Sequence, residues 1–160
     1  KELLKHERKM MAMVGDMGEK PALSLVELAR HCLGTEDDGA LTKPAIRDHM
    51  AQHLMREQAI ASLGERIYQQ GKAGQVDSRL PLLMKYLGTR EIQAKDELIL
   101  ELLGAEGLTM EDPSIVADSR KRVKQWAFNK ALTIAGGTSE IQLNIIAKRA
   151  LGMPSVGGKS

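Results

Sequence analysis

The chain has very few aromatic residues, and this scarcity limits the secondary structure that it can form. Phe, Trp and Tyr make up 2% of its 160 residues. No segment alternates Val, Ile, Thr or Tyr with polar residues, the pattern of which strands are usually built. Leu, Ala, Ile and Met are plentiful instead. The fold is therefore expected to be all-α.

Long apolar runs, strong net charge and paired cysteines are also absent. No apolar run reaches the roughly 18 residues that a membrane span needs. The net charge is only +2, and the basic cluster at residues 120–124 has no interleaved aromatic residues, so a nucleic acid is not expected as partner. Cys32 is the single cysteine and cannot form an internal disulfide. Because no signal-peptide pattern is visible, we expect a cytoplasmic location.

Apolar residues recur every three or four positions, which is typical of amphipathic helices. Ile46, Met50 and Leu54 show this spacing in one segment. Proline, glycine and capping residues divide the pattern. The expected helices cover residues 1–14, about 21–33, 44–70, 78–103, about 115–133 and 139–151. Long helices with short connections favour an antiparallel bundle.

The length suits one compact domain. The chain starts at Lys1 and opens directly into helical sequence, which looks like the product of a truncation. We expect residues 1–154 to form the domain and residues 155–160 to form a flexible tail.

The most informative stretch runs from residue 131 to residue 154. Gly136 and Gly137 allow a sharp backbone turn, and Ser139 with Gln142 three residues later forms a capping-box pattern that predicts a helix start. The free N–H groups of a helix start attract anions, including a pyrophosphate. By itself, however, a glycine break before a capped helix is usually only a turn.

The order of residues in this stretch resembles the C-terminal signature of acyl-CoA dehydrogenases. The shared features are a Gly-Thr-Ser turn, a Glu, Ile-Gln, Ile-Ile-Ala, a basic residue and Leu-Gly. Upstream, residues 98–108 look like the Gly-rich loop that follows the penultimate core helix of this family. The resemblance implies an antiparallel four-helix bundle with extra C-terminal helices. It also implies that the N-terminal helical domain and the middle β domain are absent from this chain.

The resemblance further implies FAD as the cofactor, held between this domain, a β-rich domain and partly a neighbouring subunit. Five residues are thereby expected to bind the flavin: Gly104, Gly107, Gly137, Thr138 and Glu140. Such enzymes desaturate an acyl-CoA thioester: a carboxylate takes a proton from the α carbon while hydride passes from the β carbon to the flavin. The implied partners are an electron-transferring flavoprotein and further subunits, either identical or related to this chain.

The catalytic base must be a carboxylate near the α carbon. In the best-known branch of the family a Glu precedes the Gly-Thr pair, but this chain has Gly136 there. A second branch, which includes enzymes similar to the isovaleryl- and long-chain-acyl dehydrogenases, takes the Glu from a Leu-x-x-Glu-Arg string in an early helix, and residues 4–8 match that string. The resemblance thus implies Glu7 as the base, with Arg8 orienting the thioester or the base. Without the resemblance to this family, Glu7 and Arg8 would be interpreted as a solvated charged pair.

Two other interpretations concern residues 36–58. The family's Arg-x-x-Phe-Gly motif, which reaches the flavin of a second subunit, is not visible there. The alternative function is therefore a non-catalytic structural or oligomerisation domain of a heteromeric enzyme.

His49, His53 and Glu57 recur every four residues and would share one helix face. A polar bundle surface explains them better than a metal site, because their neighbours Arg47, Asp48, Gln52 and Arg56 are also polar. A di-iron bundle would need paired Glu-x-x-His motifs, which are lacking, and no metal is expected.

Overall fold

The structure is a computed structural model that describes residues 24–75, 77–104 and 117–154. Within these ranges every element is a helix, apart from an isolated antiparallel bridge between Thr35 and Leu41. The all-α prediction is confirmed. The helix expected over residues 1–14 and the tail expected at residues 155–160 lie outside the described residues.

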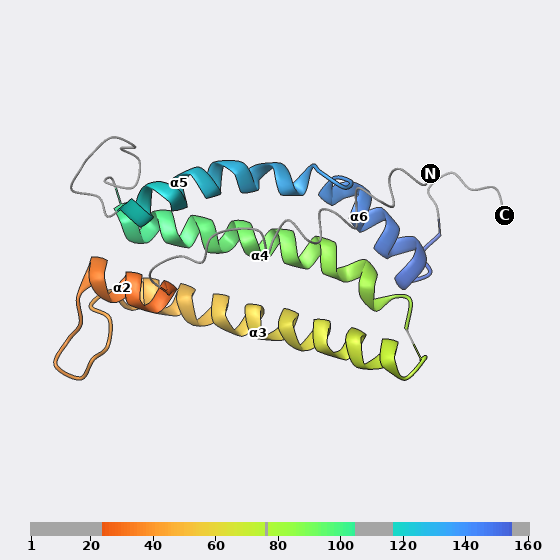
Figure 1. The fold of residues 1–160 in the computed structure, drawn as a ribbon, viewed down its shortest axis with the longest axis horizontal. Coiled ribbons are helices and arrows are strands. Elements are labelled where there is room, and N and C mark those ends of the chain that lie inside the picture. The colour runs from red at the N-terminus through yellow and green to blue at the C-terminus, as the bar shows by residue number, and fades with distance from the viewer. Residues whose placement is uncertain (1–23, 76, 105–116, 155–160) are drawn as a thin grey trace.

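Three long helices form the framework (Figure 1). They are α3 (Pro44–Lys72), α4 (Leu80–Leu103) and α5 (Ala117–Asn129). Helix α4 lies in the middle and packs against both α3 and α5, and each neighbour runs antiparallel to it. The connection from α3 to α4 is short, as an antiparallel helix pair requires. None of the described helices combines the length and apolar composition of a bilayer-spanning segment.

Two short helices pack against opposite ends of α4. Helix α2 (Leu25–Leu33) covers its C-terminal end, and α6 (Ser139–Ile145) covers its N-terminal part (Figure 1). A capping box starts α2: the Ser24 hydroxyl accepts from the Glu27 N–H at 3.2 Å, and the Glu27 carboxylate accepts from the Ser24 N–H at 2.7 Å. The helix therefore begins at residue 25, a few residues later than its proline suggested.

The C-terminal helices are less regular than the sequence predicts. Helix α5 stops at Asn129 and continues as the 3-10 helix η2 (Lys130–Thr133). Helix α6 likewise changes at residue 146 into the π-helix η3 (Ile146–Ala150). The apolar pattern predicted one continuous helix in each place, because a tightening or widening of the backbone spiral hardly alters apolar spacing over a single turn.

The main apolar core joins α2, the start of α3 and the end of α4. Its buried members are Leu25, Leu28, Ala29, Leu41, Ile46, Met50, Leu98, Ile99 and Leu102. Beyond residue 53, α3 has no fully buried residue. On the other side of α4, Val123, Leu132 and Ile146 are buried in α5, η2 and η3. Thus α4 is covered on two sides by different sets of residues.

Candidate functional site

The Gly-Gly-Thr segment forms a tight turn between η2 and α6, here named the glycine turn (residues 136–138). Gly136 has φ 67° and Gly137 has φ 103°, both in the left-handed region that side chains disfavour. Thr138 is the N-cap of α6, and its hydroxyl accepts from the Ile141 N–H at 3.3 Å. The prediction of Ser139 as cap was wrong by one residue: Ser139 is already helical, whereas Thr138 has the extended backbone of a capping residue.

Gln142 also has a different role from the one that a capping box would give it. Its side chain is buried and folds back, so that Nε2 donates to the Gly136 carbonyl at 3.1 Å. A Cβ added at Gly137 would lie 2.9 Å from this same Nε2. The positive φ favours glycine at residue 137, and a side chain there would in addition displace the end of the Gln142 side chain.

Helix α4 holds the segment that leads into the glycine turn by bonds to its backbone. Lys85 Nζ donates to the Leu132 carbonyl at 2.6 Å. Gln93 Nε2 donates to the Asn129 carbonyl at 3.0 Å and lies 3.3 Å from the Thr133 hydroxyl. Burial lowers the pKa of Lys85. These carbonyls lie where the α-helical ladder changes to 3-10, so side-chain donors stabilise an otherwise under-bonded stretch.

A buried polar pair joins α4 to the end of α5. Asn129 Nδ2 donates to the Asp96 carboxylate at 2.8 Å, and both residues are buried. Gln125 Nε2 in turn donates to Asn129 Oδ1 at 2.8 Å. Burial raises the pKa of Asp96, and the bond from Asn129 opposes that shift. The pair therefore fixes the start of η2 relative to α4.

The residues expected at the flavin fall into separate groups. Gly137, Thr138 and Glu140 lie together at the start of α6. Glu140 is exposed, and its pKa is lowered by bonds from its own backbone N–H and from the Thr138 hydroxyl. Gly104 ends α4 at φ 61°, about 28 Å along the helix from Lys85 at roughly 1.5 Å per residue. Within a single chain, Gly104 and the glycine turn therefore lie far apart.

The remaining expected site residues, Glu7, Arg8 and Gly107, lie outside the described residues. Sequence reasoning gave no role to Lys85 or Gln93, which hold the segment before the glycine turn, and it gave Gln142 a different role. Only Gln142 had a local signal, the capping-box spacing, and that signal predicted a different hydrogen bond.

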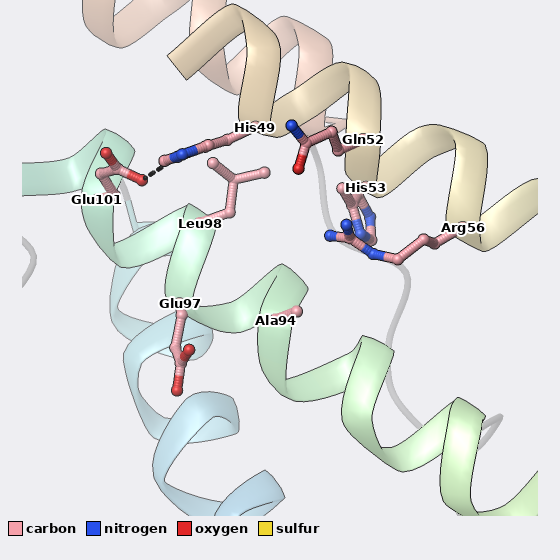
Figure 2. A pocket seen from close by; sticks show the side chains of 8 residues that line it. All are labelled: His49, Gln52, His53, Arg56, Ala94, Glu97, Leu98 and Glu101. Carbon is pink, nitrogen blue, oxygen red and sulfur yellow. Dashed lines mark hydrogen bonds and ion pairs between the residues drawn. The ribbon is translucent and has the colours of Figure 1, made fainter. Parts of the chain in front are cut away.

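The groove between α3 and α4 holds a second polar constellation (Figure 2). His53 is 2% exposed, and its Nδ1 lies 2.6 Å from Glu91 Oε1. Arg56 Nε donates to the other oxygen of Glu91 at 2.8 Å. His49 reaches Glu101 across the groove at 3.4 Å (Figure 2). The cavity beside these residues has a volume of about 220 Å³.

The same groove explains the periodic set of His49, His53 and Glu57. Each residue pairs with its own partner on α4, and for Glu57 that partner is Lys95, whose Nζ donates at 3.0 Å. In the described ranges no cluster of three His, Cys, Asp or Glu side chains could hold a metal ion. The set therefore joins two helices.

Comparison with known proteins identifies relatives over most of the chain. A family model described as "Acyl-CoA dehydrogenase, C-terminal domain" matches residues 1–151. The acyl-CoA dehydrogenase IpdE1 of Mycobacterium tuberculosis is 33% identical over 137 residues, covering 82% of this chain and 31% of that protein. IpdE1 of Mycolicibacterium smegmatis is 33% identical over 131 residues, covering 82% of this chain and 30% of the relative.

A third relative is the acyl-CoA dehydrogenase FadE34 of Mycobacterium tuberculosis, 31% identical over 110 residues, which cover 69% of this chain and 14% of that protein. The matched part of this chain thus spans less than a third of each relative's length. No solved structure matches the chain.

Proposed function

The chain belongs to the acyl-CoA dehydrogenase family, of which it carries the C-terminal domain, and we propose on this premise that it is part of an FAD-dependent enzyme. The reaction proposed is α,β-desaturation of an acyl-CoA thioester. The observation that carries the proposal is the glycine turn, whose shape is held from within by Gln142 and which leaves Thr138 and Glu140 accessible.

The glycine turn fits a ligand with hydrogen-bond acceptors. The Gly136 carbonyl points to Gln142, and the described chain has no cis peptide bond. In a trans peptide the C=O and the following N–H point in opposite directions, so the Gly137 N–H is directed away from Gln142. A ligand would therefore approach this N–H from the face that the Gln142 carboxamide does not occupy.

Three residues at the turn would hold the flavin. Gly137 offers its N–H. The Thr138 hydroxyl accepts from the Ile141 N–H and donates to Glu140, so Thr138 offers the remaining lone pair of its oxygen. Glu140 stays ionised because its pKa is lowered, so it presents acceptor oxygens to hydroxyl or N–H groups of the cofactor. When bound, FAD supplies the acceptor for the hydride that leaves the β carbon.

Gly104 and Gly107 are proposed to serve the flavin of a neighbouring subunit. Gly104 lies at the opposite end of α4 from the glycine turn, so a flavin at one chain's turn is far from that chain's own Gly104. The active protein is accordingly proposed to be a homo-oligomer or a heteromer with a related subunit. An electron-transferring flavoprotein as acceptor and a cytoplasmic location complete the proposal.

Glu7 is proposed as the catalytic base and Arg8 as the residue that orients the base or the thioester. The support is the Leu-x-x-Glu-Arg string at residues 4–8, together with Gly136 at the other position where the family carries a Glu. A carboxylate is required because the α proton must be removed as hydride leaves.

The experiment compares acyl-CoA oxidation by the complete protein with that of Glu7→Gln, with FAD content measured in both. Glu2→Gln, in the same segment, is the matched control. Loss of a general base typically costs a factor of about 10² to 10⁴ in rate, so activity should collapse in Glu7→Gln while flavin stays bound and the control stays active.

Unchanged activity in Glu7→Gln would place the base in another chain. It would favour the alternative function, a non-catalytic structural or oligomerisation domain of a heteromeric enzyme. The absence of an Arg-x-x-Phe-Gly motif from residues 36–58 is the observation that supports this alternative.

A further inference from the structure

We propose that Gln142 is a positioning residue that sets the conformation of the glycine turn and thereby places Thr138 and Glu140 against the cofactor. The inference rests on the proposed function, because it presumes that FAD binds at this turn. It assigns to Gln142 no contact with FAD. Its effect passes through the backbone of residues 136–138.

The first support is the bond from Gln142 to the Gly136 carbonyl. Gln142 is 7% exposed and its Nε2 lies 3.1 Å from Gly136 O, six residues earlier in the chain. Because Thr138 caps α6 by itself, Gln142 is not needed as a partner in a capping box. Its carboxamide is free to fix a peptide that lies outside the helix.

The second support is the packing of the carboxamide over Gly137. A Cβ at this position would approach Nε2 to 2.9 Å, closer than Cβ atoms normally come to another heavy atom. Two consecutive glycines have many accessible backbone conformations. The Gln142 amide bonds to the carbonyl of Gly136 and fills the space beside Gly137, so it selects one backbone conformation for the two glycines.

The third support is that the segment before the turn is held independently. Lys85 and Gln93 bind the carbonyls of Leu132 and Asn129, and these bonds do not involve Gln142. Loss of the Gln142 amide should therefore release residues 136–138 while η2 stays in place. The expected defect is local to the turn and differs from general unfolding.

The experiment uses the complete protein with bound FAD and compares wild type, Gln142→Met and Gln142→Glu. Met keeps the length of the side chain but cannot donate. One net hydrogen bond corresponds to a factor of roughly ten in an equilibrium constant, so Gln142→Met should bind FAD about tenfold more weakly. Its flavin absorption spectrum should also change, while the helical content of the apoprotein stays the same. Asn144→Ala, an exposed change on α6, is the matched control and should leave both flavin readouts unchanged.

The pH dependence of FAD binding provides a readout that a merely structural role would not produce. An ionised Glu at residue 142 cannot donate to Gly136 O, whereas a protonated one can, and burial favours protonation. FAD affinity of Gln142→Glu should therefore rise relative to wild type as the pH falls from 8 to about 5.5. Gln142→Met should show no such rise.

Three outcomes are decisive. Wild-type protein that retains no FAD would refute the proposed function itself. If wild type binds FAD and Gln142→Met matches it in affinity and spectrum, the function survives and the role of Gln142 is wrong. If Gln142→Met loses helical content, the pH profile of Gln142→Glu decides, and a flat profile relative to wild type would overturn the inference.

Discussion

Helix α4 holds its two neighbours by different kinds of contact. Toward α3 the polar contacts join side chain to side chain: Glu91 binds both His53 and Arg56. Toward η2 side-chain pairs also occur, such as Glu97 with Lys130. Only on this side, however, do Lys85 and Gln93 donate to backbone carbonyls. A side-chain pair sets how two regular helices lie against each other. A bond to a carbonyl can hold backbone that has left the helical pattern.

This difference assigns different tasks to the two sides. The α3 side contains the main apolar core and bears most of the stability. The other side holds the segment that leads into the glycine turn. Changes on the α3 side should thus lower the free energy of unfolding with little effect on FAD, and changes on the η2 side should do the reverse.

The strongest way to disturb the α3 side is Leu102→Ala. Leu102 is 4% exposed in the core shared by α2, α3 and α4. Truncation of a buried Leu costs about 2–5 kcal/mol, from lost burial and the cavity left behind. Urea unfolding should show this loss, whereas Leu143→Ala, at a site 46% exposed, should change the free energy of unfolding by less than about 0.5 kcal/mol. An equal effect of the two changes would contradict the position of the core.

Glu91→Ala tests the polar part of the same side. It removes the partner of a buried imidazole and of Arg56, and an unsatisfied buried polar group costs about 1–3 kcal/mol. Thermal unfolding should occur at lower temperature, while FAD affinity per folded molecule stays constant. Glu91→Gln keeps one acceptor for His53 and should lose less. A large drop in FAD affinity with Glu91→Ala would erase the division between the two sides.

Gln93→Leu tests the opposite side. Its carboxamide donates to backbone where α5 changes into η2. The expected result is a several-fold loss of FAD affinity, with a change in unfolding free energy of no more than about 1.5 kcal/mol for one net bond. Equilibrium dialysis of FAD together with urea unfolding separates the two quantities. Unaltered FAD binding would mean that η2 does not control the turn.

The smallest effect is expected from Asp96→Asn, and it depends on pH. Burial raises the pKa of Asp96 in the folded state. The protonated carboxyl therefore makes its full contribution to the free energy of unfolding at pH values below the ordinary pKa of the carboxyl. That stability is lost as the pH rises through the folded-state pKa. Asn cannot ionise, yet its oxygen can still accept from Asn129. The variant should therefore gain thermal stability relative to wild type between pH 4 and pH 7. If the unfolding temperatures of the two proteins change in parallel with pH, an ionised, buried Asp96 is excluded.

Much of the helical framework could be predicted from local signals. Pro44 at the first position of α3 and Gly104 directly after α4 correctly marked those boundaries. The capping box of α2, Ser24 with Glu27, is a signal of the same kind, but the prediction of a start near Pro21 overlooked it. Such signals are readable because a cap or a breaker acts within one helical turn of its own position. The positions of the 3-10 and π segments left no comparable pattern.

The candidate site could be predicted only in part. The sequence singled out Gly137, Thr138 and Glu140, which the structure does bring together at one helix start. It also predicted Ser139 as the cap, because Ser and Thr are both good caps and only the backbone angles distinguish them.

By itself the sequence determined the helical class, most helix ends and the presence of a glycine turn, since each follows from residue type and short spacing. Tertiary structure alone decided that Gln142 bonds to Gly136, that His53 meets Glu91 from 38 residues away, and that Gly104 lies at the far end of α4. These contacts depend on how helices pack and where a backbone leaves the helical pattern. Both are set by the fit of many side chains at once, so no single stretch of sequence contains them.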